Sequence, residues 1–534
     1  MRFQYVESFL KATSSGGGDD YINISARDEQ GCYFNDILNC FMEESEEDDD
    51  DDNRLPSYMF KMAKKRRLDE MNSKPKEKQT RSPGSSAKQN VMGEDGNIRR
   101  GTWKDSLWWL NYVEAPHLLT PRLKHKFRRR FRMPFESWQK LVLMLKNDDH
   151  FSVWHDGSTD AFGTRASPIE LLSLAVLRYL GRKCTFDDLE ELTFISERTH
   201  GRFFQAFIDY GSTILYKAYV ISPQTADEAK THMHEMNLAG FNGAIGSMDA
   251  SNVIIINCRY GLRQAHLGHK LSKTARTYNI IVNHRRRILA STGGHPSRWN
   301  DKTIVLFDEF IQDLRNGKVL CDNEFELLER DADGNITSAQ YKGVWVQVDN
   351  GYLEWSITIP PYKCCSDLKE VRWSQWMESM RKDVECTFGI LKKRWTILDK
   401  GIEASIIENA DKVWLTCCAL HNMLLEIDGY DELWEGEISS DPLLNENAPF
   451  SVRRLHDDDE ANVRLHSDNL GRESNNGEII DSDHAGPGRR TKDVQEVWKM
   501  GQEQFRQRLV EHFDILFESY EIKWPTRVKV PRSV

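Results

Sequence analysis

The pattern of apolar and polar residues changes near residue 241, and this change constrains the fold more than any other feature. Before it, residues 135–220 read as successive helices, with cap signals such as Ser167-Pro168-Ile169-Glu170. After it come short β-branched runs bounded by polar or turn residues, among them NGAIGSMD, NVIIIN, TYNIIVNH, RILAST, KGVWVQVD and SITIPPY. Apolar helices are expected at residues 374–398 and 408–426. Strands alternating with helices behind an all-helical region predict an α/β core preceded by an all-α domain.

The helical region contains a candidate helix-turn-helix. Thr185 is expected to cap the short helix FDDLEELT, and Ser196 to cap a second helix, ERTHGRFFQAFIDYGSTIL. A short helix, a tight turn and a capped second helix are the layout of this DNA-binding motif, and also of an ordinary helical hairpin. On the DNA-binding interpretation, the exposed start of the second helix carries Glu197, Arg198, His200 and Arg202.

A basic segment at residues 122–132, RLKHKFRRRFR, holds seven Lys or Arg in eleven positions. Bases at this density, interleaved with aromatic residues, suit contacts with DNA phosphates. Phe127 and Phe131 lie four residues apart and are expected on a buried helix face, which would leave Arg128, Arg129 and Arg132 facing outward.

The charges of the chain are segregated. The net charge is −11, but residues 43–52 (EESEEDDDDD) alone carry nine acids, and the remaining 74 acids nearly balance the 72 bases. Residues 1–100 have the composition of a disordered tail, with Lys64-Lys65-Arg66-Arg67 in a cluster that resembles a bipartite nuclear localisation signal. We therefore expect a nuclear protein. The acidic block fits a solubilising or autoinhibitory tail.

No stretch reaches the roughly 18 to 20 apolar residues of a membrane span, and the amino terminus lacks the features of a secretory signal. Ten Cys are scattered without any C-x-x-C pair, which argues against a zinc ribbon and a disulfide scaffold. These features predict an intracellular protein that does not act in a membrane.

Two further elements are expected towards the C-terminus. FELLERDADGNITSAQY predicts a hairpin with its turn at DADGN, and a calcium loop is disfavoured because no Glu stands at the twelfth position. The segment DVQEVWKMGQEQFRQRLVEHFDILFESY predicts one amphipathic helix that covers the core or a partner chain. The expected organisation is a tail at 1–100, a helical DNA-binding region at 101–225, the α/β domain at 226–430, a disordered linker at 431–492 and the terminal helix at 493–534.

Three acids stand where a metal site would place them. Asp249 is expected to end the strand GAIGSMD, Asp349 ends VWVQVD, and Glu385 lies mid-helix beside the apolar stripe. Strand ends bring carboxylates to a common edge, and a helix packed across that edge adds a third. Grouped carboxylates bind Mg²⁺ or Mn²⁺, and two such ions activate water and stabilise the leaving oxygen in phosphoryl transfer. Thirty-five residues separate Asp349 from Glu385.

Six stretches together resemble one family of enzymes. They are GAIGSMDASNV, GGHPSRWNDKTIVLFDEF, VDNGY, IPPY, VECTFGILKKRW and CCALHNMLLEIDG, in this order between about 241 and 429. The sequence is similar to transposases of the PIF/Harbinger superfamily, close to the plant transposon protein group and the Harbinger transposase-derived nuclease-like proteins. The resemblance implies a ribonuclease H-like DDE catalytic core behind the helical region.

The resemblance also implies site residues. The first acid of the family falls on Asp249, the second on Asp349 and the Glu on Glu385, in a DD35E arrangement. Asp301 matches a further family Asp, near the site or in competition with the second position. Three departures are Ala250 after the first Asp, Val348 before the second and Cys386 in place of an Arg; none of them alters a metal ligand. His421-Asn422 belongs to an apolar helix, where a satisfied core His is favoured over a metal ligand.

The function implied is that of a DNA transposase, which binds terminal inverted repeats, cleaves strands with Mg²⁺ or Mn²⁺, and transfers the freed 3′-hydroxyl to target DNA. The family members act as oligomers with a Myb/SANT-like accessory protein, so a homo-oligomer and such a partner are expected. Two alternatives share the sequence features: a host-domesticated, transposase-derived protein that binds DNA or chromatin partners without cutting, and a general Mg²⁺-dependent nuclease.

Overall fold

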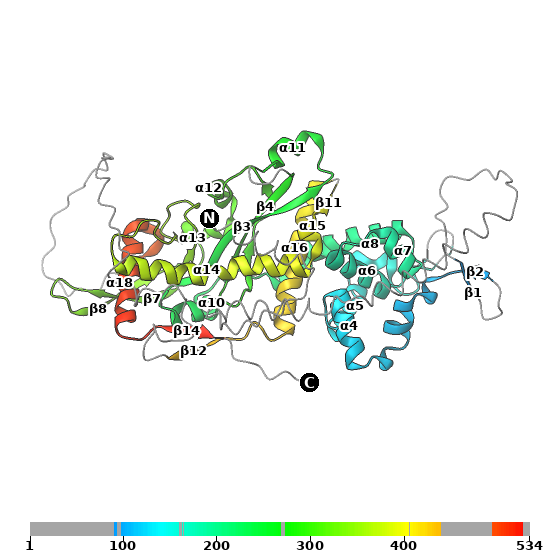
Figure 1. The fold of residues 1–534 in the computed structure, drawn as a ribbon, viewed down its shortest axis with the longest axis horizontal. Helices are drawn as coiled ribbons and strands as arrows, with labels where there is room; N and C mark the ends of the chain where they lie inside the picture. Colours follow the sequence, from blue (N-terminus) through cyan, green and yellow to red (C-terminus); the bar gives the residue numbers. More distant parts are fainter. Residues whose placement is uncertain are drawn as a thin grey trace, which may run out of the picture. The chain divides into compact units, whose positions relative to one another are not determined.

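The computed structural model describes residues 90–92, 98–159, 163, 165–268, 273–404, 406–438 and 494–526. All of these residues belong to one compact unit. The acidic block, the basic cluster at residues 64–67 and most of the expected linker lie outside the described residues. The described residues form a helical region, a mixed sheet covered by helices, and a C-terminal segment (Figure 1). A mixed α/β architecture behind a helical region is therefore confirmed.

The helical region starts with short turns and continues with longer helices. Its elements are η1 (Trp103–Asp105), η2 (Trp109–Glu114), η3 (Pro116–Leu118), α4 (Pro121–Phe131), α5 (Phe135–Lys146), η4 (Asp149–Trp154), α6 (Ile169–Arg182), α7 (Phe186–Thr193), α8 (Glu197–Tyr210), η5 (Gly211–Leu215) and α9 (Tyr216–Tyr219). In α4, Phe127 and Phe131 are both fully buried, as their spacing predicts. Their rings pack 4.7 Å apart and contact Tyr112.

The helix-turn-helix layout is present in α7 and α8. The hydroxyl of Thr185 accepts the N–H of Asp188 at 3.1 Å, and the Asp188 carboxylate accepts the N–H of Thr185 at 2.8 Å. The hydroxyl of Ser196 caps α8 by accepting the N–H of Thr199 at 3.4 Å, without a reciprocal bond. Caps of this kind join residues three positions apart, which is why the sequence locates them well. The cap expected at Ser167 is wrong by one residue, because α6 begins at Ile169 with Pro168 before it.

The central sheet combines antiparallel and parallel strands. Its strands are β3 (Ala244–Ile256), β4 (Ala275–Val282), β5 (Ile288–Ser291), β9 (Trp345–Gln347) and β10 (Thr358–Ile359), in the order β10-β9-β3-β4-β5. β3, β4 and β5 are antiparallel neighbours, whereas β9 pairs parallel with β3 and β10 parallel with β9. The short strands β6 (His295–Pro296) and β11 (Ile402–Glu403) pair with β4 and β3. Helix α10 (Ala226–Leu238) precedes β3, and the connections between the strands contain α11 (Tyr260–His266), α12 (Asp301–Ile304), η6 (Val305–Phe307) and α13 (Glu309–Arg315).

Three helices follow the sheet: α14 (Leu368–Arg394), α15 (Thr396–Lys400) and α16 (Ile407–Ile427). α14 runs across β3 and β4 (Figure 1). It begins earlier than predicted, because the carboxylate of Asp367 accepts the N–H of Glu370 at 2.9 Å and caps the helix there. The predicted apolar stripe is buried, with Trp376, Met380 and Val384 all fully inaccessible.

A C-terminal layer packs beside the sheet. It contains the predicted hairpin of β7 (Glu324–Arg330) and β8 (Ile336–Lys342), then β13 (Gln495–Glu496), η7 (Val497–Lys499) and α18 (Gln502–Glu518). The expectation of one helix from residue 493 is wrong, since α18 begins at Gln502. Trp498 lies against Gly317 and Gly343, where a Cβ atom would come within 2.6 and 2.9 Å of its ring. This long-range contact overrides the local helical pattern.

Short strands also form where the sequence predicts disorder. β1 (Asn90–Met92) pairs with β2 (Ile98–Arg100) inside the expected tail. β12 (Glu435–Ile438), at the start of the expected linker, pairs with β14 (Lys523–Thr526). Composition carries no signal for the second pairing, because the partner strand is far away in the sequence.

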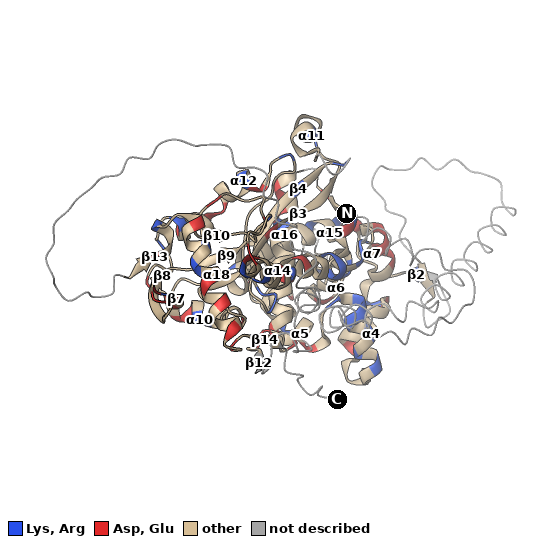
Figure 2. Cartoon of the chain, turned by 60° about the vertical axis from the view of Figure 1, so that its left-hand side comes forward, with Lys and Arg blue, Asp and Glu red and all other residues tan. Residues whose placement is uncertain are grey.

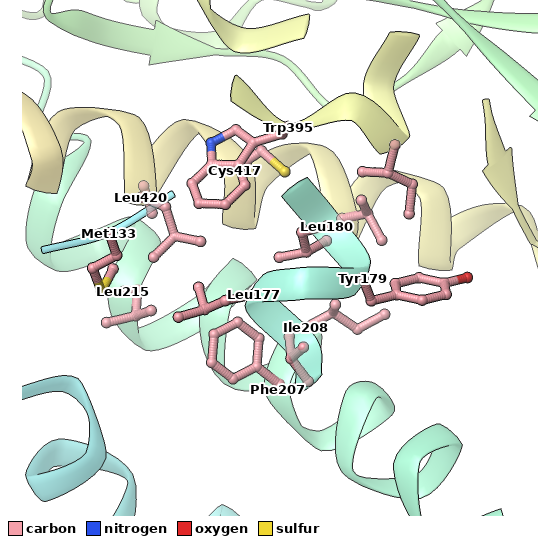
Figure 3. Close-up of a cluster of buried hydrophobic side chains, with 14 of the residues drawn as sticks. Met133, Leu177, Tyr179, Leu180, Phe207, Ile208, Leu215, Trp395, Cys417 and Leu420 are labelled. Carbon is pink, nitrogen blue, oxygen red and sulfur yellow. The ribbon is translucent and has the colours of Figure 1, made fainter. Parts of the chain in front are cut away.

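One hydrophobic cluster joins the helical region to the sheet-bearing region. Figure 3 shows Leu177, Phe207 and Leu215 of the helical region together with Trp395, Cys417 and Leu420 of the region that follows the sheet. All of these side chains are fully buried. Burial of apolar surface contributes about 25 cal/mol per Å², so this cluster stabilises the attachment of the helical region. None of the helices in the described ranges combines the length and apolarity that a membrane crossing requires.

Candidate active site

The register between β3 and β9 brings Asp249 and Asp349 to the same level of the sheet. The two strands run parallel, and Ser247 of β3 pairs with Gln347 of β9. Asp249 and Asp349 each lie two residues beyond that pair, on adjacent chain segments running in one direction. Residues two apart along a strand point to the same face. The predicted meeting of two acids at adjacent strands therefore has a geometric basis.

Asp249 does not end its strand, which corrects one expectation. β3 continues to Ile256, and Asp249 and Ala250 pair with Ile280 and Asn279 of β4. The polar residues that follow Asp249 suggest, from the sequence alone, that the strand ends there. The backbone pairing with β4 continues through them, because hydrogen bonding in the ladder does not depend on side-chain polarity.

Glu385 of α14 and Asp349 both lie close enough to Asp249 to change its pKa. Burial raises the pKa of Asp249 to about 7, the N–H of Ala250 and the guanidinium of Arg381 act in the opposite direction, and the charges of Asp349 and Glu385 raise the pKa further. The N–H of Ala250 donates to the Asp249 carboxylate at 2.8 Å. A carboxyl group with a pKa near 7 is partly protonated at neutral pH, and a nearby cation favours its ionised form.

Asp301, at the start of α12, lies beside Asp349. A Cβ atom placed on Gly351 would lie 2.9 Å from the Oδ2 of Asp301 and 2.9 Å from the Oδ1 of Asp349. The N–H of Gly351 also donates to Asp349 at 2.7 Å. A side chain at position 351 would therefore displace these two carboxylates, and Asp301 lies next to Asp349.

A buried network of hydrogen bonds connects the turn after Asp349 to β4. The hydroxyl of Tyr352 donates to the amide oxygen of Asn279 at 2.8 Å, and the amide nitrogen of Asn279 donates to Asp308 at 2.8 Å. Burial raises the pKa of Tyr352 well above its usual value, and the charge of Asp249 raises it further. The phenol thus stays protonated and holds the turn that carries Asp349 against β4.

The carboxylates of the candidate site are suitable ligands for a divalent metal ion, but their side chains are not arranged around one point. Carboxylate oxygens are the ligands that Mg²⁺ and Mn²⁺ prefer. Within the part of the chain that the structure describes, no three His, Cys, Asp or Glu side chains come together closely enough to hold a metal ion. The charges of Asp349 and Glu385 act on Asp249, which indicates that the three acids are near one another but does not define a coordination sphere.

The predicted DNA-contacting residues divide into two groups. On α8, Arg198 and Arg202 are exposed one turn apart. His200 is buried at 2 % exposure, which corrects its expected place on the surface. Its Nε2 lies 2.8 Å from the hydroxyl of Thr193, which itself donates to the carbonyl of Leu189. Because the hydroxyl hydrogen of Thr193 is donated to Leu189, the Nε2–H of His200 donates to the Thr193 oxygen. The turn of α8 after Glu197 brings position 200 back against α7.

The basic segment lies on α4, where Lys and Arg residues follow one another along the helix (Figure 2). Arg128 is exposed but pairs with Asp428 at 2.7 Å. Arg129 is half-buried. Arg132 is half-buried at the C-cap in a left-handed conformation, φ 62°. Helix α4 ends before Arg132, so this residue does not share the outward face on which the sequence analysis placed it.

Sequence reasoning missed several residues of the site. Arg381 stands four residues before Glu385, the spacing that puts both on one helix face, and this signal was readable. Asn279 acts through contacts across the sheet and had no local signal, whereas Gly351 belongs to the VDNGY stretch and its N–H donates to Asp349 two residues earlier. His421 is fully buried and its Nε2–H donates to the carbonyl of Arg286 at 2.9 Å, while burial lowers its pKa to about 3. His421 therefore lies in the core with one ring nitrogen hydrogen-bonded, while its Nδ1 has no hydrogen-bond partner among the described residues.

Comparison with known families agrees with this geometry. Residues 249–422 match the family described as DDE superfamily endonuclease. The match begins at Asp249 and spans Asp301, Asp349 and Glu385. It supports a relationship to DDE transposase-like proteins, an endonuclease activity in general and DNA as the substrate. No curated protein and no solved structure gave a significant match.

Proposed function

We propose that the chain is a DNA transposase of the PIF/Harbinger type, which cuts DNA strands and transfers them at a site formed by Asp249, Asp349 and Glu385. The observation that carries this proposal is the parallel register of β3 and β9, which aligns two acids within the family match, with Glu385 in electrostatic reach. The strand order β10-β9-β3-β4-β5 supports a ribonuclease H-like catalytic core.

The proposed cofactor is Mg²⁺ or Mn²⁺, with two ions per site. Bound divalent ions supply activation of water and stabilisation of the leaving oxygen in such reactions. Asp249, Asp349 and Glu385 are the residues that would hold them, with Asp301 near the site. Because Asp249 is partly protonated near pH 7, it is expected to release its proton when the site is charged with cations. The positive charge of Arg381 lowers the pKa of Asp249 and so partly offsets the repulsion from Asp349 and Glu385.

The helical region is proposed to hold the DNA. Arg198 and Arg202 lie on the exposed face of α8, the second helix of the helix-turn-helix, and Arg128 and Arg129 lie on α4. Contacts from such residues to phosphates would position the terminal inverted repeats, with base contacts adding specificity. Nuclear localisation, a homo-oligomer and a Myb/SANT-like accessory protein complete the proposal.

The alternative function is that of a domesticated, transposase-derived protein. Such a protein would keep the fold and the basic helices and bind DNA or chromatin partners without cleaving strands. The two functions make opposite predictions for metal binding and for strand cleavage.

The test uses the purified full chain, a labelled duplex carrying the terminal repeat and the accessory protein. Mg²⁺- or Mn²⁺-dependent nicking is expected for the native chain and for Asp333→Asn, a control in the exposed β7–β8 turn. Nicking should fall at least about a hundredfold in Asp249→Asn, Asp349→Asn and Glu385→Gln, since each variant removes a proposed ligand. Titration calorimetry with Mn²⁺ should show binding that these variants lose. DNA binding without nicking or Mn²⁺ binding would support the alternative.

A further inference from the structure

Three aromatic rings at β6 and η6 form a compact cluster, the ring stack, in which His295 is half-buried and the other two rings are exposed. The ring of Trp299 lies 5.6 Å from His295 at an interplanar angle of 24°, and 5.1 Å from Phe307 at 25°. The rings of His295 and Phe307 also lie 5.9 Å apart, tilted at 41°. Trp299 is 37 % exposed and Phe307 is 55 % exposed. Aromatic side chains usually bury their faces, so two nearly parallel rings left open to solvent form a surface ready to stack on another flat group.

The stack is mounted on hydrogen-bonded backbone. The N–H of Trp299 donates to the carbonyl of Pro296 at 2.9 Å, and Asn300 caps α12 through the N–H of Thr303. The hydroxyl of Ser297 donates to the carbonyl of His266 at 2.6 Å, which ties the segment to the connection between β3 and β4. The rings are thus held in place before any ligand arrives, which lowers the entropic cost of binding.

The surroundings of the stack select a ligand that is both flat and negatively charged. Arg298 and Lys302 are exposed on either side of Trp299 in the sequence. Asp301 belongs to the same segment, and its carboxylate lies beside Gly351, as does the carboxylate of Asp349. The rings therefore adjoin both cationic groups suited to phosphates and the acids proposed to cut a phosphodiester bond.

We infer that His295, Trp299 and Phe307 form a stacking site for an unpaired nucleobase of the DNA strand that enters the acidic site. The inference rests on the proposed function. Every base has a π-face, so aromatic stacking of this kind accepts any sequence. A protein partner is disfavoured because Arg298, Asn300 and Lys302, all exposed, interrupt the apolar surface. An unpaired base next to the cut position would hold the strand end away from its duplex.

The experiment measures binding of the full chain to two labelled duplexes in buffer with EDTA, which prevents metal-dependent cleavage. One duplex is blunt, and the other ends in an unpaired overhang carrying 2-aminopurine, whose fluorescence falls when it stacks. The native chain should bind the overhang duplex about tenfold more tightly and quench its fluorescence. Trp299→Ala should lose both effects. Trp299→Phe, which keeps a ring, and Leu306→Ala, which removes a neighbouring exposed side chain without a ring, should keep them.

The outcomes separate this inference from the proposed function. Equal binding of both duplexes by the native chain, without quenching, would overturn the stacking site and leave the DNA-binding function standing. Failure to bind either duplex would overturn both. If Trp299→Ala retains preference and quenching but alters the apparent mass in gel filtration, the rings form an interface between copies of the chain and the inference is wrong.

Discussion

The Nδ1 of His284 lies 2.6 Å from the Oδ2 of Asp383, and both side chains are almost completely buried. Arg286 donates to the other carboxylate oxygen of Asp383 at 3.3 Å. His284 and Arg286 belong to the turn between β4 and β5, whereas Asp383 lies on α14 two residues before Glu385. This contact fixes the height at which α14 crosses the sheet, and with it the position of the third acid.

Breaking this contact should destabilise the protein strongly. Asp383→Ala leaves the buried His284 and the half-buried Arg286 without their shared carboxylate. A broken buried pair costs about 3–5 kcal/mol. Urea denaturation should show this loss in free energy of unfolding. Asp399→Ala, in an exposed pair with Lys400, should change it by less than about 1 kcal/mol. Equal stability of the two variants would contradict the role given to Asp383.

Gly351→Ala should impair cleavage more than stability. The new Cβ would come within 2.9 Å of carboxylate oxygens on both Asp301 and Asp349, so these side chains must move. We expect nicking to fall by about tenfold or more, with the melting temperature nearly unchanged. Gly261→Ala provides the control, because nothing lies within 4 Å of a Cβ there. Native cleavage by Gly351→Ala would show that the positions of these carboxylates do not limit the reaction.

Burial of His200 should make the stability of the native chain depend on pH. Burial lowers the pKa of His200 to about 4, below its unfolded value near 6.5. The unfolded state then binds more protons between these values, so stability is lost as pH falls below about 6.5. Between pH 7 and pH 5 the native chain should lose up to about 2 kcal/mol from this group. His200→Gln should show a smaller loss in denaturation curves at the two pH values, and an identical loss would contradict the assignment.

Replacement of Arg198 and Arg202 should change the salt dependence of DNA binding. If both contact phosphates, the double Ala variant should reduce the slope of log affinity against log salt by about 2. Its stability should remain close to native, because both side chains are exposed. Lys230→Ala on α10, also exposed, serves as the control. An unchanged slope in the double variant would exclude α8 as the DNA-contacting helix.

The terminal helix should be indispensable to the fold. Phe513 of α18 stacks 5.6 Å from Phe241 and packs edge-on 5.9 Å from Trp376 of α14. Phe513→Ala should cost about 3–5 kcal/mol in urea denaturation, because it opens a cavity between these rings. Tyr520→Ala, at an exposed position just after the helix, should be nearly neutral. A small cost at Phe513 would mean that α18 is only loosely attached.

Local patterns in the sequence were enough to predict much of the fold. The caps at Thr185 and Ser196, the hairpin turn at DADGN and the stripe of α14 all arise from residues a few positions apart, so their signals survive in the linear order. The α/β class followed from the change in periodicity at residue 241. The motifs around Asp249, Asp349 and Glu385 predicted these three residues as the acids of the site, and the family match spans all three positions.

The tertiary structure alone decided how these parts meet. The pairing of Ser247 with Gln347 aligns two acids, and the approach of Asp301 to Asp349 through Gly351 joins segments from different connections. The same holds for the burial of His200, the start of α18 at Gln502 and the exposed ring stack around Trp299. Each depends on contacts between residues far apart in the chain. Such contacts are selected by packing and backbone pairing across the whole core, and no local window of sequence records them.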